Sequence, residues 1–530
     1  SMGTVVKAAA RAYHIAKRAM GIKGSPDSNP FPIDAWTDAS YASWFEVHKA
    51  TEFDLEQQRK AANEFRINPM FSFIVPLYRT PLDYLRVMSE SVLGQTYENL
   101  QLVLVNASPE LSTLASAVHA LEVRDSRVTV VTLEENLGIT ENTNAGIAAA
   151  MGDFCCFLDH DDYIDCDLLF EYVKKINERP DIDFLYCDED LVIEDDKTAG
   201  FSHRNPFFKP DYSPELLLCK NGIIHLMTIR KSIIEAMPKP GAEFDGSQDY
   251  NMALFCSSAA REVCHVPRVM YHWRISENST ATNPDSKPYS LYSCRKAQAT
   301  HFERQQIDAS IVSSGIYLLH NPWFKAPASK VSVVVDIQPW LEGLDNGRGA
   351  AFDAIDQFLE FFLQNNSHDD FEILLVGHGV DSWRFGNHVR TLDSPMGVSH
   401  FSRLNIGASY ACGEYLIFLD AGCSFDSAEP IEQLLGLCSL EGVGVAAPKI
   451  LYRGGRNKMY GIAVTGERIM PLYRGYEDDF PGYQCNLRTF QNVSACGVQG
   501  LTISRELFEC IGGFDERFES EVGAKLTLGN

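Results

Sequence analysis

The sequence lacks any apolar run near the ~20 residues that a membrane-spanning helix needs. Cysteine is sparse, with 14 in 530 residues and no CxxC pair, which excludes a disulfide scaffold, a zinc ribbon and a thioredoxin-type site. Basic residues are also few: 46 against 71 acidic residues leave a formal net charge of −25, so we expect no nucleic-acid partner. The remaining composition, 45% hydrophobic and 22% charged, predicts a globular cytoplasmic protein with reduced core thiols.

The first seventy residues differ in pattern from the rest. Residues 5–23 place basic side chains along one face of a predicted helix, and no acidic residue precedes Asp27. Such a helix is suited to peripheral contact with the anionic inner face of a cell membrane, and the alternative is an ordinary solvated helix. A breaker segment at 24–32 and a polar helical stretch at 41–65 follow. We therefore expect a helical N-terminal segment over residues 1–69.

From residue 71 onward, short apolar strands alternate with helical stretches. Strand-like runs lie at 71–78, 100–107, 127–133 and 154–159, and their centres are 26 to 29 residues apart, the length of a βαβ unit. Strands that are apolar along their whole length are buried on both faces, which predicts a mostly parallel sheet. The expected fold class is therefore α/β, and ligands of such sheets bind at the carboxyl ends of the strands.

The same layout recurs in the second half of the chain. Residues 144–159 (NAGIAAAMGDFCCFLD) align without a gap to residues 405–420 (NIGASYACGEYLIFLD). This internal match predicts two tandem Rossmann-like domains, at residues 70–325 and 326–530. The predicted strands of the second copy are residues 331–336, 372–377 and 415–420.

The densest acidic cluster, LDHDDY, follows directly on the apolar run FCCFL. Asp159, Asp161 and Asp162 fall within four residues at the carboxyl end of a predicted strand. Three carboxylates repel one another unless a cation lies among them, and Mn²⁺ or Mg²⁺ with oxygen ligands is the usual cation. The cluster therefore predicts a nucleotide-diphosphate site, with a solvated acidic turn as the alternative. A second acidic run, YCDED (186–190), either lines an acceptor side or caps a strand end.

Several longer motifs together carry a resemblance to a known family. NLGITENTNAGIAAAMGDFCCFLDHDD (136–162), GSQDYNMAL (246–254) and VPRVMYHWR (266–274) resemble family 2 glycosyltransferases of the GT-A fold, among them bacterial O-antigen and rhamnose-polysaccharide enzymes. The resemblance is dense over the first 300 residues and looser beyond. It implies an inverting, metal-dependent enzyme that moves a sugar from a dTDP- or UDP-type donor to a glycan or lipid-linked glycan acceptor.

The resemblance also assigns roles residue by residue. Asp249 matches the general base and Asp161 the metal ligand, while His272 is either a further metal ligand or a packed structural residue. Arg274 matches a loop that closes on the diphosphate, and Asp159 would face the ribose. The nucleoside pocket would be lined by Pro76, Tyr78, Asn106, Asn136, Gly138 and Asn144. The family usually has Asp where this sequence has Asn106. The amide of Asn106 still offers a donor and an acceptor to a nucleobase.

The second copy departs from the first at the acidic cluster. LDHDD becomes LDAGC, so that Gly422 stands where the first copy has Asp161. Glycine offers no ligand atom from a side chain, and we expect this copy to be inactive. The chain then reads EVGAKLTLGN where the family continues with an acidic motif, which predicts a truncated domain. The alternative is a second, metal-independent transferase that uses Asp420 with Glu519 or Glu521.

Two other functions remain open from the sequence. A nucleotidyltransferase should carry a basic, glycine-rich phosphate loop near the first strand, and VPLYRTP (75–81) has no glycine. A catalytically silent scaffold that binds sugar nucleotides or polysaccharide has no need to retain both Asp161 and Asp249. The glycosyltransferase interpretation is therefore favoured over both.

Overall fold

The computed structural model describes residues 38–195, 200–275, 289–343, 348–380, 385–420, 422–424, 429–465 and 468–517. The basic segment predicted at 5–23 lies outside these residues, as do Glu519 and Glu521. Within the described part of the chain, no helix has the length and apolarity that crossing a bilayer requires.

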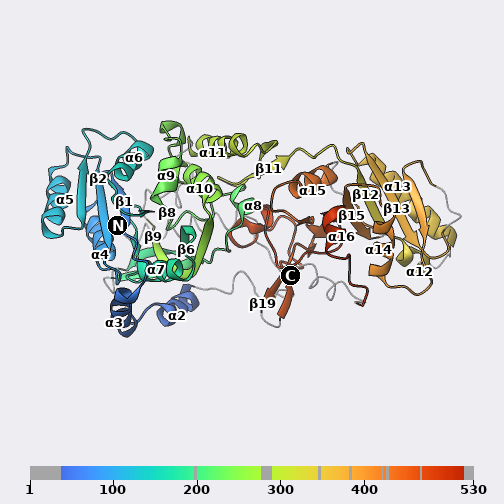
Figure 1. The fold of residues 1–530 in the computed structure, drawn as a ribbon, viewed down its shortest axis with the longest axis horizontal. Helices are drawn as coiled ribbons and strands as arrows, with labels where there is room; N and C mark the ends of the chain where they lie inside the picture. The colour runs from blue at the N-terminus through green and yellow to red at the C-terminus, as the bar shows by residue number, and fades with distance from the viewer. Residues whose placement is uncertain are drawn as a thin grey trace.

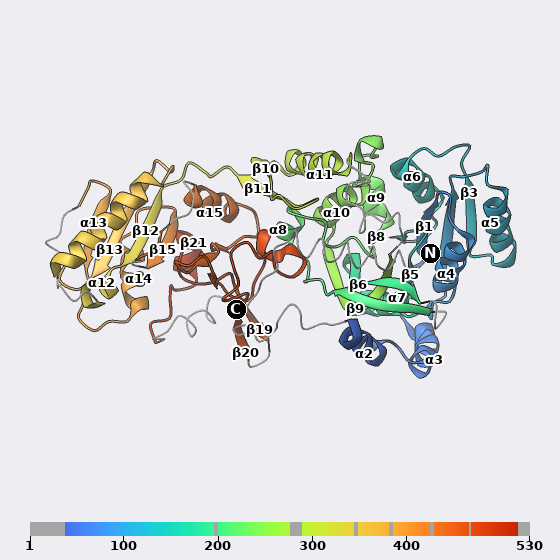
Figure 2. The ribbon, with the colours of Figure 1, turned by 180° about the vertical axis from the view of Figure 1, so that it is seen from behind.

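The predicted helical stretch at 41–65 is two helices with a break between them. They are α2 (Asp38–His48) and α3 (Glu52–Ala61), followed by a short 3-10 turn. The break occurs at Thr51 because its hydroxyl accepts from the Asp54 amide at 3.2 Å while the Asp54 carboxylate accepts from the Thr51 amide at 2.9 Å, which starts a new helix. Helix α2 lies under β9 (Figure 2) and buries Tyr41 and Phe45 there.

The first sheet begins with four parallel strands in the order β3-β2-β1-β4. This confirms the predicted α/β class, and each predicted strand is present within one to two residues. The strands and intervening helices are β1 (Phe71–Leu77), α4 (Leu82–Leu93), β2 (Leu100–Asn106), α5 (Ser112–Arg124), β3 (Val128–Thr132), α6 (Ile139–Ala149), β4 (Phe154–Phe157) and α7 (Leu168–Glu178).

The sheet then continues beyond β4 as β8-β6-β9-β5, and β7 pairs with β6. Strand β8 runs antiparallel to β4, so the sheet is mixed rather than purely parallel. The added elements are β5 (Tyr163–Ile164), β6 (Ile182–Asp195), β7 (Gly200–Phe207), α8 (Pro214–Leu217), β8 (Thr228–Arg230), α9 (Lys231–Ala236), α10 (Gln248–Ala259), β9 (Glu262–Arg274) and α11 (Tyr289–Gln305). The hairpin of β10 (Ala309–Ser313) and β11 (His320–Phe324) follows and connects the first half of the chain, residues 38–324, to the second sheet.

The second sheet repeats the order of the first, as β14-β13-β12-β15 in parallel with β21 antiparallel to β15. Its strands are β12 (Val331–Asp336), β13 (Phe371–Gly377), β14 (Val389–Asp393), β15 (Tyr415–Asp420), β16 (Val445–Ala446) and β21 (Leu501–Ser504). Its helices are α12 (Gln338–Gly343), α13 (Arg348–Gln364), α14 (His400–Ser409), α15 (Pro430–Cys438) and α16 (Arg505–Cys510). Two hairpins precede β21, namely β17 (Ile450–Leu451) with β18 (Asn457–Met459) and β19 (Ile462–Thr465) with β20 (Arg468–Pro471).

The aligned glycines of the two copies occupy matching environments. A Cβ at Gly146 on α6 would lie 2.5 Å from Cγ2 of Ile74 on β1, and a Cβ at Gly407 on α14 would lie 2.3 Å from Cγ1 of Val334 on β12. Glycine therefore lets each helix approach its sheet closely. Both copies also use a buried serine in the first strand to accept a glycine amide at 2.8 Å, which keeps the turn before the fourth strand in place.

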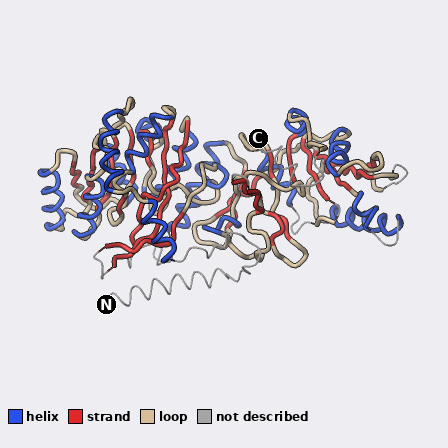
Figure 3. Tube along the Cα trace, turned by 90° about the horizontal axis from the view of Figure 1, so that it is seen from below, coloured by secondary structure: helices blue, strands red, loops and turns tan. Residues whose placement is uncertain are grey.

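The two sheets lie at opposite ends of an elongated molecule (Figure 1). Seen from below, the strands of the first sheet gather at one end and those of the second at the other (Figure 3). Helix α8, strand β11 and helix α15 lie between them (Figure 1). Hydrogen bonds cross this seam, including Ser213 Oγ to Asn492 Oδ1 at 2.8 Å and Tyr483 Oη to the Pro206 carbonyl at 2.6 Å.

Candidate functional site

The carboxyl ends of β1, β2 and β4 meet at one edge of the first sheet, because parallel strands end on the same side. Pro76 is half-buried in β1, and Tyr78 just beyond it is exposed, with the Arg79 guanidinium 5.4 Å from its ring. Asn106 ends β2 and is fully buried; its Oδ1 accepts from the Ser108 amide at 3.0 Å. Its Nδ2 has no partner among the described residues, so it can donate to a ligand at this edge.

The loop before α6 lies at the same edge and is tightly cross-linked. Asn136 Oδ1 accepts from the Gly138 amide at 3.2 Å and from Asn142 Nδ2 at 2.8 Å. Gly138 has φ = 92°, and a Cβ there would lie 2.7 Å from the Asp245 carboxylate, so this position requires glycine. Asn144, one helical turn into α6, donates to a backbone carbonyl at 3.0 Å. These residues shape the loop, and their contact with a nucleoside stays a prediction.

The three carboxylates of the acidic turn after β4 differ in how deeply they are buried. Asp159 is exposed, Asp161 is half-buried and Asp162 is fully buried. Asp162 accepts from the Tyr271 hydroxyl at 2.5 Å and from the Arg274 amide at 2.8 Å, which ties the turn to β9. Burial, with the charges of its two acidic neighbours, raises the pKa of Asp162 well above its usual value. The sequence pattern gave Asp162 no role of its own, although its place directly after Asp161 in the acidic cluster was a signal.

Asp159, Asp162 and His225 form a group that could hold a cation, since one ligand atom from each lies within 4.8 Å of the others. His225 also lies 2.9 Å from Glu189 through Nδ1. Sequence reasoning missed His225 because nothing near it in the chain indicates the site. The predicted ligand Asp161 is not in this group, so its role stays a prediction. Burial raises the pKa of Asp161, as does the neighbouring charge of Asp159.

His272 is fully buried in β9 between two carboxylates. Its Nδ1 lies 2.7 Å from Asp190 and its Nε2 lies 3.1 Å from Asp165. Burial alone would lower the pKa of His272, but the two carboxylates outweigh burial and raise it to about 10. An imidazolium with both nitrogens protonated has no lone pair for a metal. His203 also approaches Asp190, at 2.8 Å. One ligand atom each from Asp190, His203 and His272 also lies within 4.8 Å of the others, as a metal site requires, so the role of His272 stays a prediction.

Asp249 lies in the first turn of α10. Its Oδ1 accepts from the Tyr250 amide at 2.8 Å, and its Oδ2 lies 3.4 Å from Nδ2 of Asn221. Burial raises the pKa of Asp249 to about 6; among the nearby charges, His225 lowers it and Asp159 raises it. Asp249 therefore shares one electrostatic environment with the acidic turn, and its carboxylate changes protonation close to neutral pH.

Arg274 at the end of β9 joins the acidic turn after β4 to neighbouring aromatic side chains. Its Nε donates to the Asp161 carbonyl at 2.6 Å, and its Nη1 pairs with Glu194. The guanidinium also lies 4.2 Å from the Tyr84 ring and 4.8 Å from the Phe201 ring. Nη2 has no partner within the described part of the chain. That nitrogen can therefore donate to an anionic oxygen.

The acidic run YCDED does not follow a strand, as the sequence had indicated, but lies inside β6. Its carboxylates are buried and each has a basic partner: Glu189, for example, contacts Lys209 Nζ and His225 Nδ1, both at 2.9 Å. Buried charges are tolerated in a strand when they are paired. Sequence reasoning missed this because the partners come from other segments of the chain.

At the matching edge of the second sheet, the acidic cluster is replaced. Gly422 has φ = 84° and is followed by Cys423 and Ser424. At the end of β12, the buried Asp336 contacts His400 Nδ1 at 2.6 Å and accepts from Arg403 Nε at 2.7 Å.

Comparison with known proteins identifies relatives of this chain. Residues 72–235 match the profile of glycosyl transferase family 2. An uncharacterized protein of Sinorhizobium fredii is 27% identical over 84% of this chain and 49% of its own length. An O-antigen biosynthesis protein of Myxococcus xanthus is 26% identical over 93% of this chain and 38% of its own length. The chain thus spans half or less of these relatives.

Among solved structures, Staphylococcus aureus TarS residues 1–349 in complex with UDP-GlcNAc is 19% identical, with a TM-score of 0.36 over 44% of this chain and 66% of that one. A mannosyltransferase from Pyrobaculum calidifontis in complex with GDP-Man and Mn²⁺ is 15% identical, with a TM-score of 0.33 over 51% of this chain and 75% of that one. The family profile covers the strand edge and the acidic turn built above. Residues 72–235 of the chain therefore form a domain of glycosyl transferase family 2.

Proposed function

We propose that the chain transfers a sugar from a nucleotide-diphosphate donor, of the dTDP or UDP type, to a hydroxyl of a growing bacterial surface glycan. The proposal assigns the chemistry to residues 70–325 and none to residues 326–530. The observation that carries it is Asp249, a carboxylate whose pKa is raised to about 6 beside the acidic turn of a family 2 domain. A silent scaffold has no need for a base tuned in this way.

The reaction is a single displacement. Deprotonated Asp249 accepts the proton of the acceptor hydroxyl as its oxygen attacks the anomeric carbon. The bond from that carbon to the diphosphate oxygen breaks, and its electron pair leaves with the diphosphate. Because attack comes from the face opposite the leaving group, the anomeric centre inverts. The Tyr250 amide and Asn221 hold the carboxylate in position.

The donor would lie along the strand edge. Tyr78 and the free Nδ2 of Asn106 suit a nucleobase, beside Pro76 and the loop that holds Gly138. The free Nη2 of Arg274 suits the diphosphate, since guanidinium groups pair well with phosphate oxygens.

Mn²⁺ or Mg²⁺ fits the acidic turn. The carboxylates of Asp159 and Asp161 are hard oxygen donors that are not fully buried, while the oxygens of Asp162 are engaged by Tyr271 and Arg274. The proposal therefore assigns the cation to Asp159 and Asp161, with Asp162 fixing the turn, although Asp161 lies outside the group that Asp159 forms with Asp162 and His225. A divalent cation bound there supplies positive charge for the leaving diphosphate.

Asp249→Asn tests the proposal. The amide keeps the shape but cannot accept a proton, so donor affinity should persist while transfer falls by roughly 10²–10⁴. Nucleotide release from a panel of dTDP- and UDP-sugars, with a glycan acceptor, measures this. Asp211→Asn is the matched control, because the Asp211 side chain is 96% exposed. Unchanged transfer in Asp249→Asn would refute the assigned base. Donor binding without nucleotide release by the unmodified protein would favour the scaffold.

A further inference from the structure

Two cavities lie along the seam between the two halves, apart from the acidic turn. The first has a volume of about 640 Å³ and the second about 870 Å³. Both run along β11 and α15, and Glu215 on α8 lines both. We call the two together the seam trench. Cavities of this size between two structural units are the usual form of a ligand site.

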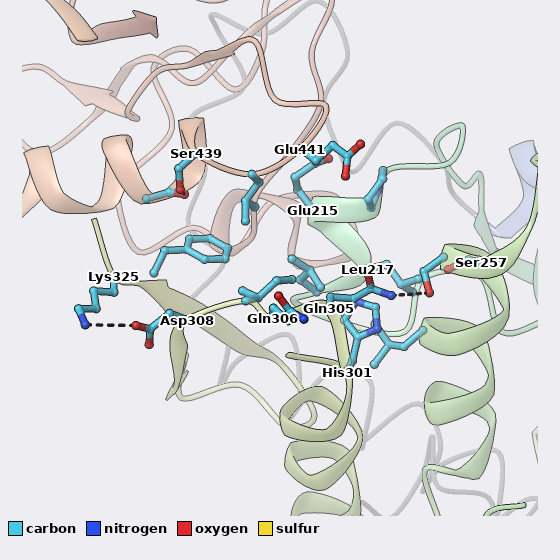
Figure 4. Close-up of a pocket in the computed structure, with 18 of the residues that line it drawn as sticks. Glu215, Leu217, Ser257, His301, Gln305, Gln306, Asp308, Lys325, Ser439 and Glu441 are labelled. Atoms are coloured by element: carbon cyan, nitrogen blue, oxygen red, sulfur yellow. Dashed lines mark hydrogen bonds and ion pairs between the residues drawn. The ribbon is translucent and has the colours of Figure 1, made fainter. Parts of the chain in front are cut away.

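The first cavity presents a buried imidazole to its interior. His301 is 6% exposed, and its Nδ1 has no hydrogen-bond partner among the described residues. Figure 4 shows it on the cavity wall below Gln305 and Gln306. Burial lowers the pKa of His301 to about 4, helped by the charge of Arg304. The ring is therefore neutral at physiological pH, and one of its nitrogens is a hydrogen-bond acceptor.

The second cavity combines an aromatic side chain with polar acceptors. Trp323 is 38% exposed, and its indole N–H donates to Glu429 at 3.0 Å, which fixes the orientation of the ring. Asn321 donates through Nδ2 to the Arg488 carbonyl at 2.8 Å, while its buried Oδ1 is unpaired within the described structure. The buried Oε2 of Glu215 likewise lacks a donor among the described residues.

The chemistry of the trench selects the class of ligand. Buried acceptors that lack donors are costly unless a ligand supplies the hydrogens, and hydroxyl groups do so. Fixed aromatic rings such as Trp323 pack on apolar faces, and sugar rings have both such faces and hydroxyls. In the first cavity, Lys325 is offset by Asp308 at 3.3 Å, as Figure 4 shows, and the carboxylates of Glu215 and Glu441 would repel an anion. The second cavity adds Lys449, which is paired with Asp478, and Arg488, so that acidic and basic side chains balance along the trench. A neutral polyhydroxylated chain therefore fits better than a nucleotide or a phosphorylated ligand.

The trench is connected to the proposed base through two elements. Helix α10 runs from Asp249 to Ser257 and Ser258, which line the first cavity; at 1.5 Å per residue this is about 13 Å. Helix α8, which carries Glu215, leads within a few residues to Asn221, the contact of Asp249. A ligand in the trench would therefore lie too far from Asp249 to be the reacting end of a glycan. The distance suits the part of the glycan behind that end.

From these observations we infer that the seam trench binds the neutral glycan that the enzyme extends, several sugars behind the growing end. This inference rests on the proposed transfer reaction, whose base is Asp249. It gives the second half of the chain a role in holding the acceptor, since α15 and the segment around Phe490 form one wall.

The test uses oligosaccharides of six to ten sugars, made by partial acid hydrolysis of the surface polysaccharide of the source cells. Calorimetry should detect binding to the whole chain, and Trp323→Ala should weaken it about tenfold. Glu215→Gln, which keeps the side-chain shape, should weaken it as well. Tyr410→Ala is the matched control, because Tyr410 is an exposed aromatic residue that lines neither cavity.

Donor binding and nucleotide release with a monosaccharide acceptor should be unchanged in Trp323→Ala and Glu215→Gln. Their transfer to the longer oligosaccharides should show a raised KM with unchanged kcat. Wild-type affinity in both variants, or no binding of any fragment by the unmodified chain, would overturn the inference. Neither result depends on Asp249→Asn, whose unchanged transfer would instead overturn the reaction itself.

Discussion

At the scale of single residues, the chemistry of the site depends on how strongly each carboxylate is desolvated. Asp162 is buried and held by Tyr271 and Arg274, so it serves as an anchor. Asp159 is exposed and free to meet a ligand. Asp249 is intermediate between the buried Asp162 and the exposed Asp159. Burial raises the pKa of Asp249 to about 6, and its carboxylate still faces the same site. One site thus holds carboxylates suited to anchoring, to cation binding and to proton transfer.

The pKa of Asp249 predicts the pH dependence of transfer. The base works only when deprotonated, so activity should be full above pH 7 and should fall about tenfold per unit as the pH drops below about 6. A pH profile of kcat, measured at saturating donor, checks this. The residual activity of Asp249→Asn serves as the control and should lack this inflection. A flat wild-type profile down to pH 5 would show that another group accepts the proton.

Asp161→Ala should abolish transfer and remove Mn²⁺-dependent donor binding, because the diphosphate loses its cation. The turn itself should persist, since Arg274 holds the Asp161 backbone carbonyl and not its side chain. Donor titrations with Mn²⁺ and with EDTA measure the effect. Asp181→Ala is a surface control, as its side chain is 72% exposed. Wild-type turnover in Asp161→Ala would exclude Asp161 as a metal ligand, and no effect of EDTA would exclude a metal at this turn.

At the scale of elements, the two halves use the same helix-on-sheet contact. Helix α6 approaches β1 through Gly146, and α14 approaches β12 through Gly407. The sheets also share the strand order in which the fourth strand is followed by an antiparallel neighbour. The second half therefore retains the packing of the first although it has replaced the acidic turn. Packing depends on residues such as Gly146 and Gly407, whereas catalysis depends on the acidic turn. The packing can therefore be retained when the catalytic residues are not.

Gly407→Ala should destabilise the second half. The new Cβ would lie 2.3 Å from Val334 Cγ1, and such overpacking costs about 1–3 kcal/mol, which exceeds the gain of about 1 kcal/mol in helix propensity. The midpoint of urea unfolding measures the change. Gly454→Ala is the control, because nothing lies within 4 Å of a Cβ there. Equal midpoints for the two variants would mean that α14 shifts without cost.

At the scale of the whole molecule, the two sheets meet across a seam that carries both polar contacts and the trench. Ser213 and Tyr483 contribute hydrogen bonds across it, so the halves are joined by specific contacts. The acidic turn lies on the first sheet, and residues 422–424 at the matching edge of the second bring no carboxylate. This division predicts one catalytic half and one supporting half.

An Asp161→Ala/Asp249→Asn double variant tests this division. Any transfer that remains must come from the second half, and we expect none, because Gly422 has no side-chain ligand and Cys423 is too soft to replace a carboxylate for Mg²⁺. Radiolabelled donor incorporation gives the needed sensitivity. Asp420→Ala in the same background is the decisive comparison: residual transfer that this change removes would falsify the inactive second half.

The sequence by itself determined the features that depend on local pattern. Apolar periodicity located β12 and β15 to the residue, and the gapless match of 144–159 to 405–420 predicted two tandem Rossmann-like domains. The shared strand order of their sheets is a finding of the structure. The acidic turn after β4 could be predicted equally well, because the strand and the turn are adjacent in the chain. Local pattern failed where a polar residue interrupted it, as at Thr51, whose capping contacts divide a predicted helix in two.

Only the tertiary structure decided which of the acidic residues act and which are merely paired. Asp162 finds Tyr271, and His272 finds Asp165, across more than 100 residues of sequence. The carboxylates of the YCDED run are paired within β6 by basic side chains from other segments of the chain, and the trench exists only where α8, β11 and α15 converge. Burial and charge pairing are properties of neighbours in space, and they set each pKa and each free hydrogen-bonding atom on which the chemistry depends.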